Sequence, residues 1–191
     1  AEKAFESLIN SQNNNIGVLI FYSNEEKIVT YSNKLDISNE IVEGKINVGL
    51  IGAGSFAFRV HLPNIIKNSE YYNLRAICSR NSSNLKIYGE KFKANYISTD
   101  YNELLNDSKI SLIVITTKHD IHGKLVIEAL EKGKNVLVEK PLAIKKGEIV
   151  EIKKILKKCK QQLFVGFNRR YSPFIIKTKD YISKIGKPLF I

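Results

Sequence analysis

Methionine is absent from the 191-residue chain, and cysteine occurs only at Cys78 and Cys159. Two cysteines are too few for a disulfide framework and follow no metal-ligand spacing, so we expect both to be structural in a reducing compartment. No apolar stretch approaches the roughly 18 residues of a membrane span, and the first residues lack the pattern of a secretory signal. The sequence therefore predicts a cytoplasmic protein without a membrane segment.

Acidic residues are outnumbered by basic ones, 19 to 30, which gives a formal net charge of +11. This balance raises the hypothesis of nucleic-acid binding, because lysine and arginine release counterions from phosphate backbones. The densest lysines, however, lie in residues 145–160 among isoleucines at helical spacing, so they mostly cover the solvated face of a helix. We therefore predict no nucleic-acid partner.

At both ends of the chain, the sequence pattern indicates only part of a folded unit. Residues 1–32 indicate one helix and one strand, which cannot bury a core unaided. Residues 33–44 belong to a polar, aperiodic stretch and are predicted to be a linker. Regular patterning spans 45–167, and 168–191 ends in an apolar tail typical of the first strand of another unit. Together with the missing methionine, these patterns indicate a piece of a longer protein.

From Lys45 onward, short apolar runs alternate with segments of helical periodicity. This alternation predicts the α/β class, with a doubly wound parallel sheet that binds ligands at the carboxyl ends of its strands. We expect strands near 46–51, 74–78, 96–97, 111–116, 136–139 and 163–167, and helices near 56–67, 83–92, 101–106, 121–132 and 145–160.

A glycine-rich turn follows the first of these strands. Gly52 permits a tight turn, Gly54 allows the backbone to approach a phosphate, and Ala57 lets the next helix lie close to the strand. The helix N-terminus, with Ser55 and Phe56, offers N–H groups to an anion. Although ordinary strand-to-helix turns also use glycine, we predict that this segment contacts a dinucleotide pyrophosphate.

The second strand ends in Ser79-Arg80, where an acidic residue would accept a hydrogen bond from an adenosine ribose. An arginine fork pairs instead with a 2′-phosphate, to which Ser79 can also donate. The pattern therefore favours NADP over NAD, although NAD remains an alternative. A loop arginine in solvent is the other interpretation.

Glu139-Lys140-Pro141 follows a strand predicted to be central in the sheet. A lysine there projects into the crevice, where it can polarise a substrate oxygen or relay its proton during hydride transfer. The alternative is a surface lysine paired with Glu139. Residue type and position leave the two interpretations about even.

The segment after the fourth strand holds two threonines and two histidines. We expect Thr116 and Thr117 to face the cofactor riboses, Asp120 to cap the next helix, and His122 to pack in its first turn. Since His119 and His122 have no cysteine or acidic cluster beside them, no metal site is predicted.

In combination, these motifs resemble the glucose-fructose oxidoreductase, inositol dehydrogenase and rhizopine-catabolism family of sugar-type dehydrogenases. The similarity covers residues 45–191, and the Glu-Lys-Pro signature is its most specific part. The other matching pieces are the glycine turn, His61-Leu62-Pro63, the stretch from Thr116 to His122, the stretch from Val165 to Tyr171, and Ile185-Gly186-Lys187-Pro188.

This resemblance implies a Rossmann fold, truncated before an α+β substrate domain that would begin near Tyr171. It implies that Lys140 is the catalytic lysine and that cofactor contacts lie near Gly52, Gly54, Ser79, Thr117, His122 and Glu139. Lys118 stands where many relatives have proline. A sugar-like substrate and a homo-oligomer formed through the missing domain are further implications, and truncation should expose apolar side chains at Phe174, Ile175, Ile176 and Phe190.

Residues 1–32 resemble, over a shorter stretch, the last helix and strand of a medium-chain alcohol dehydrogenase domain. The sequence thus favours a fused parent protein, of which 45–167 is the cofactor-binding part of an NAD(P)-dependent oxidoreductase that is inactive alone. A non-catalytic dinucleotide-binding sensor or scaffold module is the alternative.

Overall fold

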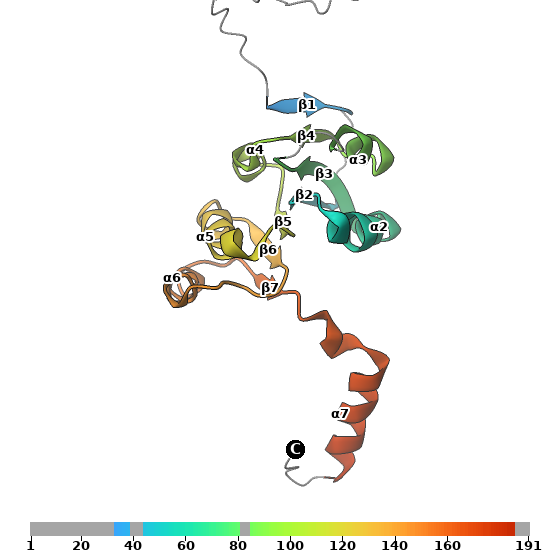
Figure 1. The fold of residues 1–191 in the computed structure, drawn as a ribbon, viewed down its shortest axis with the longest axis vertical. Helices are drawn as coiled ribbons and strands as arrows, with labels where there is room; N and C mark the ends of the chain where they lie inside the picture. The colour runs from blue at the N-terminus through green and yellow to red at the C-terminus, as the bar shows by residue number, and fades with distance from the viewer. Residues whose placement is uncertain (1–32, 39–43, 81–84, 186–191) are drawn as a thin grey trace, which may run out of the picture. The chain divides into compact units, whose positions relative to one another are not determined.

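A computed structural model describes residues 33–38, 44–80 and 85–185 (Figure 1). The helix and strand expected within residues 1–32 lie outside this part of the chain, as do the first two residues of the helix expected near 83–92. The described segments form one seven-stranded sheet with helices on both faces, which confirms the α/β class and the doubly wound topology.

The strand order is β1-β4-β3-β2-β5-β6-β7, and β2 to β7 are parallel. The order reverses between β2 and β5, so the loops after these two strands diverge and leave a crevice at their carboxyl ends. The strand bounds are β1 Lys34–Asp36, β2 Ile46–Ile51, β3 Tyr72–Cys78, β4 Tyr96–Ser98, β5 Leu112–Ile115, β6 Asn135–Val138 and β7 Leu163–Val165.

Helices α2 and α3 cover one face of the sheet, and α4, α5 and α6 cover the other (Figure 1). Each face has its own buried apolar cluster, one built around Leu50, Leu62 and Ile77, and the other around Ile113, Leu125 and Ile152. The helix bounds are α2 Leu62–Lys67, α3 Leu85–Lys91, α4 Tyr101–Asn106, α5 His122–Glu131, α6 Lys146–Leu156 and α7 Pro173–Ile185.

The helix after β2 begins with a π-helical turn, η1 (Ala57–His61), and continues directly as α2. Two shorter 3-10 turns, η2 (His119–Ile121) and η3 (Asn168–Tyr171), precede α5 and α7. Asp100 caps α4 by accepting a hydrogen bond from the Asn102 amide, whereas Asp120, which the sequence analysis expects to cap the next helix, does not cap α5. The 3-10 turn places Asp120 inside η2, so Ile121 becomes the residue before α5.

Strand β1 lies in the stretch that the sequence analysis assigns to a linker. Lys34, Leu35 and Asp36 pair antiparallel with Ser98, Ile97 and Tyr96 at the edge of the sheet. The strand carries one apolar residue, Leu35, which is 48% exposed. An edge strand of this kind has almost no burial pattern, because the β4 backbone and not a core holds it.

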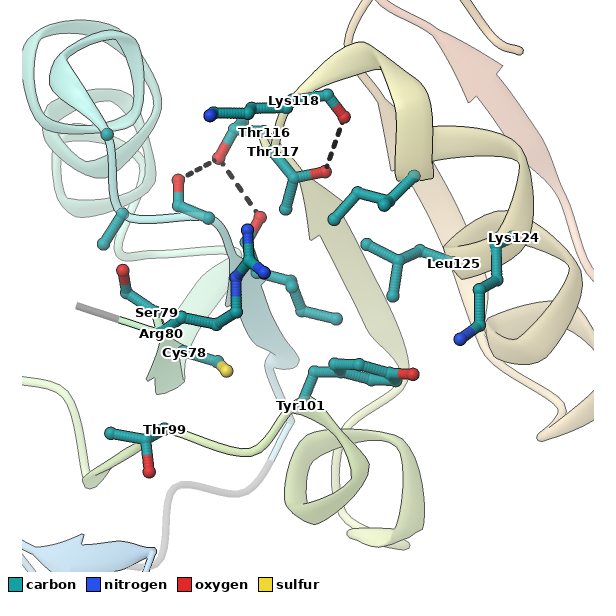
Figure 2. A pocket seen from close by; sticks show the side chains of 15 residues that line it. Cys78, Ser79, Arg80, Thr99, Tyr101, Thr116, Thr117, Lys118, Lys124 and Leu125 are labelled. Carbon is teal, nitrogen blue, oxygen red and sulfur yellow. Dashed lines mark hydrogen bonds between the residues drawn. The ribbon is translucent and has the colours of Figure 1, made fainter. Parts of the chain in front are cut away.

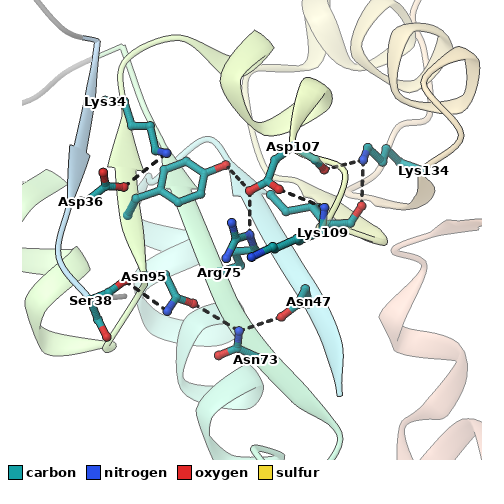
Figure 3. Close-up of polar contacts among 12 residues, drawn as sticks. Lys34, Asp36, Ser38, Asn47, Asn73, Arg75, Asn95, Asp107, Lys109 and Lys134 are labelled. Carbon is teal, nitrogen blue, oxygen red and sulfur yellow. Dashed lines mark hydrogen bonds and ion pairs between the residues drawn. The ribbon is translucent and has the colours of Figure 1, made fainter. Parts of the chain in front are cut away.

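The amino-terminal edge of the sheet is closed by a network of polar contacts (Figure 3). The Asp107 carboxylate accepts hydrogen bonds from Arg75 Nε at 2.6 Å and the Tyr96 hydroxyl at 3.1 Å. The buried Lys134 ammonium donates to the carbonyls of Asp107 and Ile110 at 2.7 and 2.8 Å. These contacts join α4 and the starts of β4, β5 and β6.

Burial and partners shift the titration of this network. Burial is the largest single influence and alone would raise the pKa of Asp107, but the hydrogen bonds from Arg75, the Lys109 amide and Tyr96, together with the charge of Arg75, outweigh it and hold that pKa below its ordinary value. Burial, followed by the charge of Asp107, raises the pKa of Tyr96. Burial lowers the pKa of Lys134, although Asp107 opposes this effect. The network is therefore a structural assembly in which each of these charged groups has a hydrogen-bond partner.

Helix α7 has no buried residue. Phe174, Ile175 and Ile176 are 83%, 39% and 55% exposed, as expected, whereas Phe190 lies outside the described residues. Across residues 33–38, 44–80 and 85–185, no helix combines the length and apolarity needed to cross a bilayer.

Candidate cofactor-binding site

A cavity of about 650 Å³ opens at the carboxyl ends of β2, β3 and β5 (Figure 2). Its wall is formed by Ile51–Gly54 after β2, Cys78–Arg80 after β3, and Thr116–Lys118 after β5. Side chains from the end of β4 and from α4 and α5 complete it: Thr99, Tyr101, Ile121, Lys124 and Leu125. The cavity therefore occupies the place where the strand order reverses.

The two glycines of the turn differ in what a side chain would meet. Gly52 has a φ of +102°, and a Cβ there would lie 2.7 Å from the backbone of Thr116 and Thr117. A Cβ on Gly54 would meet no atom within 4 Å. Gly52 is thus required by the protein itself, whereas the open space beside Gly54 is available to a ligand.

Ser55, Phe56 and Ala57, which follow Gly54 in the turn, lie outside the cavity wall. Ser55 and Phe56 are exposed, and Phe56 packs edge-on against His61 with ring centroids 5.3 Å apart. Ala57 is 1% exposed and belongs to the core beneath α2. Ala57 therefore occupies the small-residue position that the close approach of helix and strand requires.

Ser79 and Arg80 both line the cavity, beside the buried Cys78. Figure 2 shows the Arg80 side chain extending from the end of β3 over the cavity. Within the described part of the chain, its guanidinium has no hydrogen-bond or ion-pair partner. Burial, with a smaller contribution from Asp100, raises the pKa of the Cys78 thiol to about 12, so this neighbour is uncharged near neutral pH.

Thr116 ties the loop after β5 to the glycine turn. Its hydroxyl donates to the Gly52 carbonyl at 2.6 Å, and its amide donates to the Ile51 carbonyl at 2.9 Å. The Thr117 hydroxyl makes a longer bond to the Lys118 carbonyl at 3.4 Å. Both threonines therefore line the cavity, with the Thr116 hydroxyl proton already engaged.

His122 is fully buried and does not line the cavity. Its Nδ1 lies 2.8 Å from the Pro141 carbonyl and its Nε2 lies 3.0 Å from the Thr117 carbonyl. Because carbonyl oxygens only accept, a neutral ring with one N–H can donate to only one of them. The side chain joins the loop after β5 to the loop after β6.

Glu139 and Lys140 lie at the end of β6, also outside the cavity wall. Glu139 accepts from His61 Nε2 at 2.9 Å and, more weakly, from the Lys140 amide at 3.3 Å. Lys140 is exposed, and its ammonium makes no ion pair with Glu139 or with any other described residue. The sequence analysis named His61 only as part of a motif and did not foresee this contact.

The sequence analysis also missed Thr99, Tyr101, Lys124 and Leu125 as part of the cavity wall. Thr99 follows β4, so its place at a strand end was a usable signal. The others depend on how α4 and α5 pack, which no local pattern reports. Among the residues that the structure describes, no group of three or more histidine, cysteine or acidic side chains is placed to hold a metal ion.

Comparisons with known proteins identify the family of this chain. A family model described as an oxidoreductase family with an NAD-binding Rossmann fold matches residues 46–167. The oxidoreductase YrbE of Bacillus subtilis is 32% identical over 75% of the chain and 42% of its own length. The inositol 2-dehydrogenase/D-chiro-inositol 3-dehydrogenase of Lactiplantibacillus plantarum is 31% identical, with the same two coverages.

Solved structures show the same fold. A myo-inositol 2-dehydrogenase from Lactobacillus plantarum superposes with a TM-score of 0.69 at 26% identity, covering 73% of this chain and 41% of that one. The 3-ketoreductase KijD10 from Actinomadura kijaniata, at 24% identity and a TM-score of 0.67, covers 73% of this chain and 44% of its own. The chain spans less than half the length of these relatives. It belongs to the glucose-fructose oxidoreductase, inositol dehydrogenase and rhizopine-catabolism (Gfo/Idh/MocA) family of oxidoreductases, and residues 46–167 are its NAD-binding Rossmann domain.

Proposed function

We propose that this chain supplies the cofactor-binding half of an oxidoreductase that acts on a hydroxyl or carbonyl group of a sugar-like substrate. The observation that carries the proposal is the cavity, which joins an open glycine position to an unpartnered arginine at the reversal of the strand order. The inositol dehydrogenases among its relatives support the substrate class. Because the chain spans about 42% of these relatives, the substrate pocket is assigned to a further domain.

The chain's own residues have separable tasks in this proposal. The backbone at Gly54 lies against the pyrophosphate, since a Cβ there would project into open space. Thr116 holds the loop after β5 to this turn through the Gly52 carbonyl. When bound, the nicotinamide supplies or accepts the hydride. Lys140, exposed at the end of β6, donates or accepts a proton at the substrate oxygen.

We further propose that the domain prefers NADP to NAD. Arg80 extends over the cavity from the end of β3, and Ser79 lies beside it. A planar guanidinium fork suits a 2′-phosphate, and its charge is not neutralised by any described residue. Structural relatives include a complex with NADP and one with NAD(H), so the family fold accommodates both.

A titration with NADPH and NADH, followed by calorimetry, tests the cofactor assignment. We expect Arg80→Gln to weaken NADPH binding roughly tenfold and to leave NADH binding within about twofold, the loss of one charge-assisted contact. Lys153→Gln is the matched control, because it removes one positive charge from the exposed face of α6. Equal losses for both cofactors would reject the 2′-phosphate contact, and absence of binding to either would reject the proposed function.

A non-catalytic dinucleotide sensor is the second candidate, favoured by the position of Lys140 outside the cavity wall. The longer protein separates the two candidates. We expect Lys140→Met to slow hydride transfer on the order of 10²–10⁴-fold, the contribution of a proton-transfer residue, while leaving the affinity for NADPH within about twofold. A longer protein that binds NADPH and oxidises or reduces no polyol or sugar would favour the sensor.

A further inference from the structure

The contact between His61 and Glu139 joins two parts of the fold that the cavity does not connect. His61 is the last residue of η1, and Glu139 follows β6, 78 positions later in the sequence. The two side chains are 16% and 14% exposed, and their Nε2 and Oε1 atoms lie 2.9 Å apart. A carboxylate only accepts, so Nε2 carries the hydrogen in this bond.

The surroundings of Glu139 hold its carboxyl group in one place. The Lys140 amide lies 3.3 Å from its other oxygen. On the third side is Gly166, immediately after β7, where a Cβ would lie 2.9 Å from Oε1 and 3.1 Å from Oε2. A histidine, a backbone amide and a glycine surface therefore define the position of this carboxylate.

His61 is the last residue of a π-helical turn. A π turn contains one more residue than an α turn, which shifts the side chains that follow, and such turns are frequent at functional sites. The ring of Phe56 packs edge-on against His61 and restricts its orientation. The charged groups nearest the pair along the chain, Arg59 and Lys140, are exposed. Neither forms an ion pair with Glu139 among the described residues.

The position of the pair in the sheet indicates which half of a dinucleotide it faces. In a doubly wound sheet each half binds one nucleoside, with the pyrophosphate between them. Here the adenosine side is marked by Ser79 and Arg80 after β3. Glu139 lies at the carboxyl end of β6, on the other side of the reversal between β2 and β5. The carboxylate is thus on the nicotinamide side.

We propose that His61 is a positioning residue for the nicotinamide half of the site. By donating to Glu139 it fixes a carboxylate whose negative charge favours the oxidised, cationic nicotinamide over the reduced, neutral ring. This inference rests on the proposed dinucleotide-binding function and adds to it a preference for one redox state. The positive charge of Lys140 is present in every variant below and cancels from their comparison.

The test is the ratio of the dissociation constants for NADPH and NADP⁺, measured by calorimetry on the 191-residue chain. Glu139→Gln keeps the shape of the side chain and removes its charge. We expect it to lower this ratio roughly tenfold, the effect of one unit charge several ångströms away in a partly buried site. The dissociation constant for 2′-phospho-ADP-ribose, which has no nicotinamide, should change by less than about twofold.

Two variants of His61 separate positioning from packing. His61→Leu fills similar space without a donor and should lower the ratio roughly threefold, because the carboxylate loses the bond that orients it. His61→Gln presents an amide N–H near the place of Nε2 and should restore the ratio to within about twofold of the wild type. A thermal melt of each variant reports any purely structural effect.

The possible outcomes distinguish failure of this inference from failure of the proposed dinucleotide-binding function. If 2′-phospho-ADP-ribose and NADP⁺ both fail to bind the wild-type chain, the proposed function falls, and the inference falls with it. If both bind and Glu139→Gln leaves the ratio unchanged, only the inference is overturned. If Glu139→Gln lowers the ratio but His61→Leu does not, His61 has no positioning role.

Discussion

The two edges of the parallel sheet use charged side chains in opposite ways. At the amino-terminal edge, Arg75 and Tyr96 donate to Asp107, and Lys134 donates to two carbonyls (Figure 3). At the carboxyl-terminal edge Glu139 is paired with His61, but the basic side chains of Arg80, Lys118 and Lys140 have no ion-pair partner among the described residues. Satisfied polar groups stabilise a fold, whereas unsatisfied ones are available to a ligand. Stability and binding are thus assigned to opposite ends of the same strands.

Gly52 and Gly54 give the strongest test of this difference between the two ends of the strands, because both lie at the carboxyl-terminal edge, where we assign binding. We expect Gly52→Ala to lower the free energy of unfolding by roughly 3–4 kcal/mol, the sum of left-handed backbone strain and a clash with the Thr116–Thr117 backbone. Gly54→Ala, with open space around its Cβ, should leave stability within about 0.5 kcal/mol and weaken NADPH binding tenfold or more. Denaturant unfolding and calorimetry measure the two effects, and equal destabilisation would contradict the distinction.

Substitutions of Asp107 and Arg80 compare how much a charged side chain at each edge contributes to stability. Asp107→Ala should cost about 3 kcal/mol, because it removes the acceptor of Arg75 from a pair whose side chains are only 18% and 13% exposed. Arg80→Gln should change the free energy of unfolding by less than about 0.5 kcal/mol, because its guanidinium has no described partner to lose. Urea unfolding of both variants measures these free energies. A large loss of unfolding free energy in Arg80→Gln would mean that the carboxyl-terminal edge also contributes to stability.

Acidification gives the smallest expected effect. Because the native pKa of Asp107 lies below its ordinary value of 3.8, its contribution is fully present above the unfolded value and is lost as the pH falls through the native one. Asp107→Asn cannot titrate at this position, so the difference in thermal midpoint between it and the wild type should shrink as the pH falls below about 4. A difference that stays constant from pH 6 to pH 3 would show that the Asp107 carboxylate adds nothing through its charge.

Much of the fold could be predicted because its signals are local. The apolar runs of β2, β3 and β5 mark buried parallel strands, and Gly52 marks a turn with a positive φ. Where local sequence patterns are weak, the prediction missed a strand or made a helix too long. β1 has no buried residue and is paired to the sheet at β4, and α6 ends at Leu156 although its lysine-rich pattern continues to Lys160. There the chain turns at Lys157 and Lys158, which no apolar contact requires to be helical.

In the candidate site too, local features could be predicted from the sequence and contacts between distant segments could not. Ser79, Arg80 and Thr116 line the cavity, and this position could be expected because they directly follow strands whose carboxyl ends share one edge of the sheet. Their contacts with a cofactor stay a prediction. Contacts between distant segments were not predictable. The bond between His61 and Glu139 joins residues that lie 78 positions apart in the sequence, and the burial of His122 between two carbonyls depends on where two separate loops pack.

The buried Lys134 offers a way to follow local opening of the sheet by chemical labelling. Lys134 is 6% exposed and its ammonium donates to two carbonyls, while lysines such as Lys153 and Lys158 face solvent. A reagent that acetylates amines will therefore modify the exposed lysines of the native protein rapidly and Lys134 only when the sheet opens. The labelling rate at this one residue, read by mass spectrometry, reports how often the amino edge of the sheet comes apart.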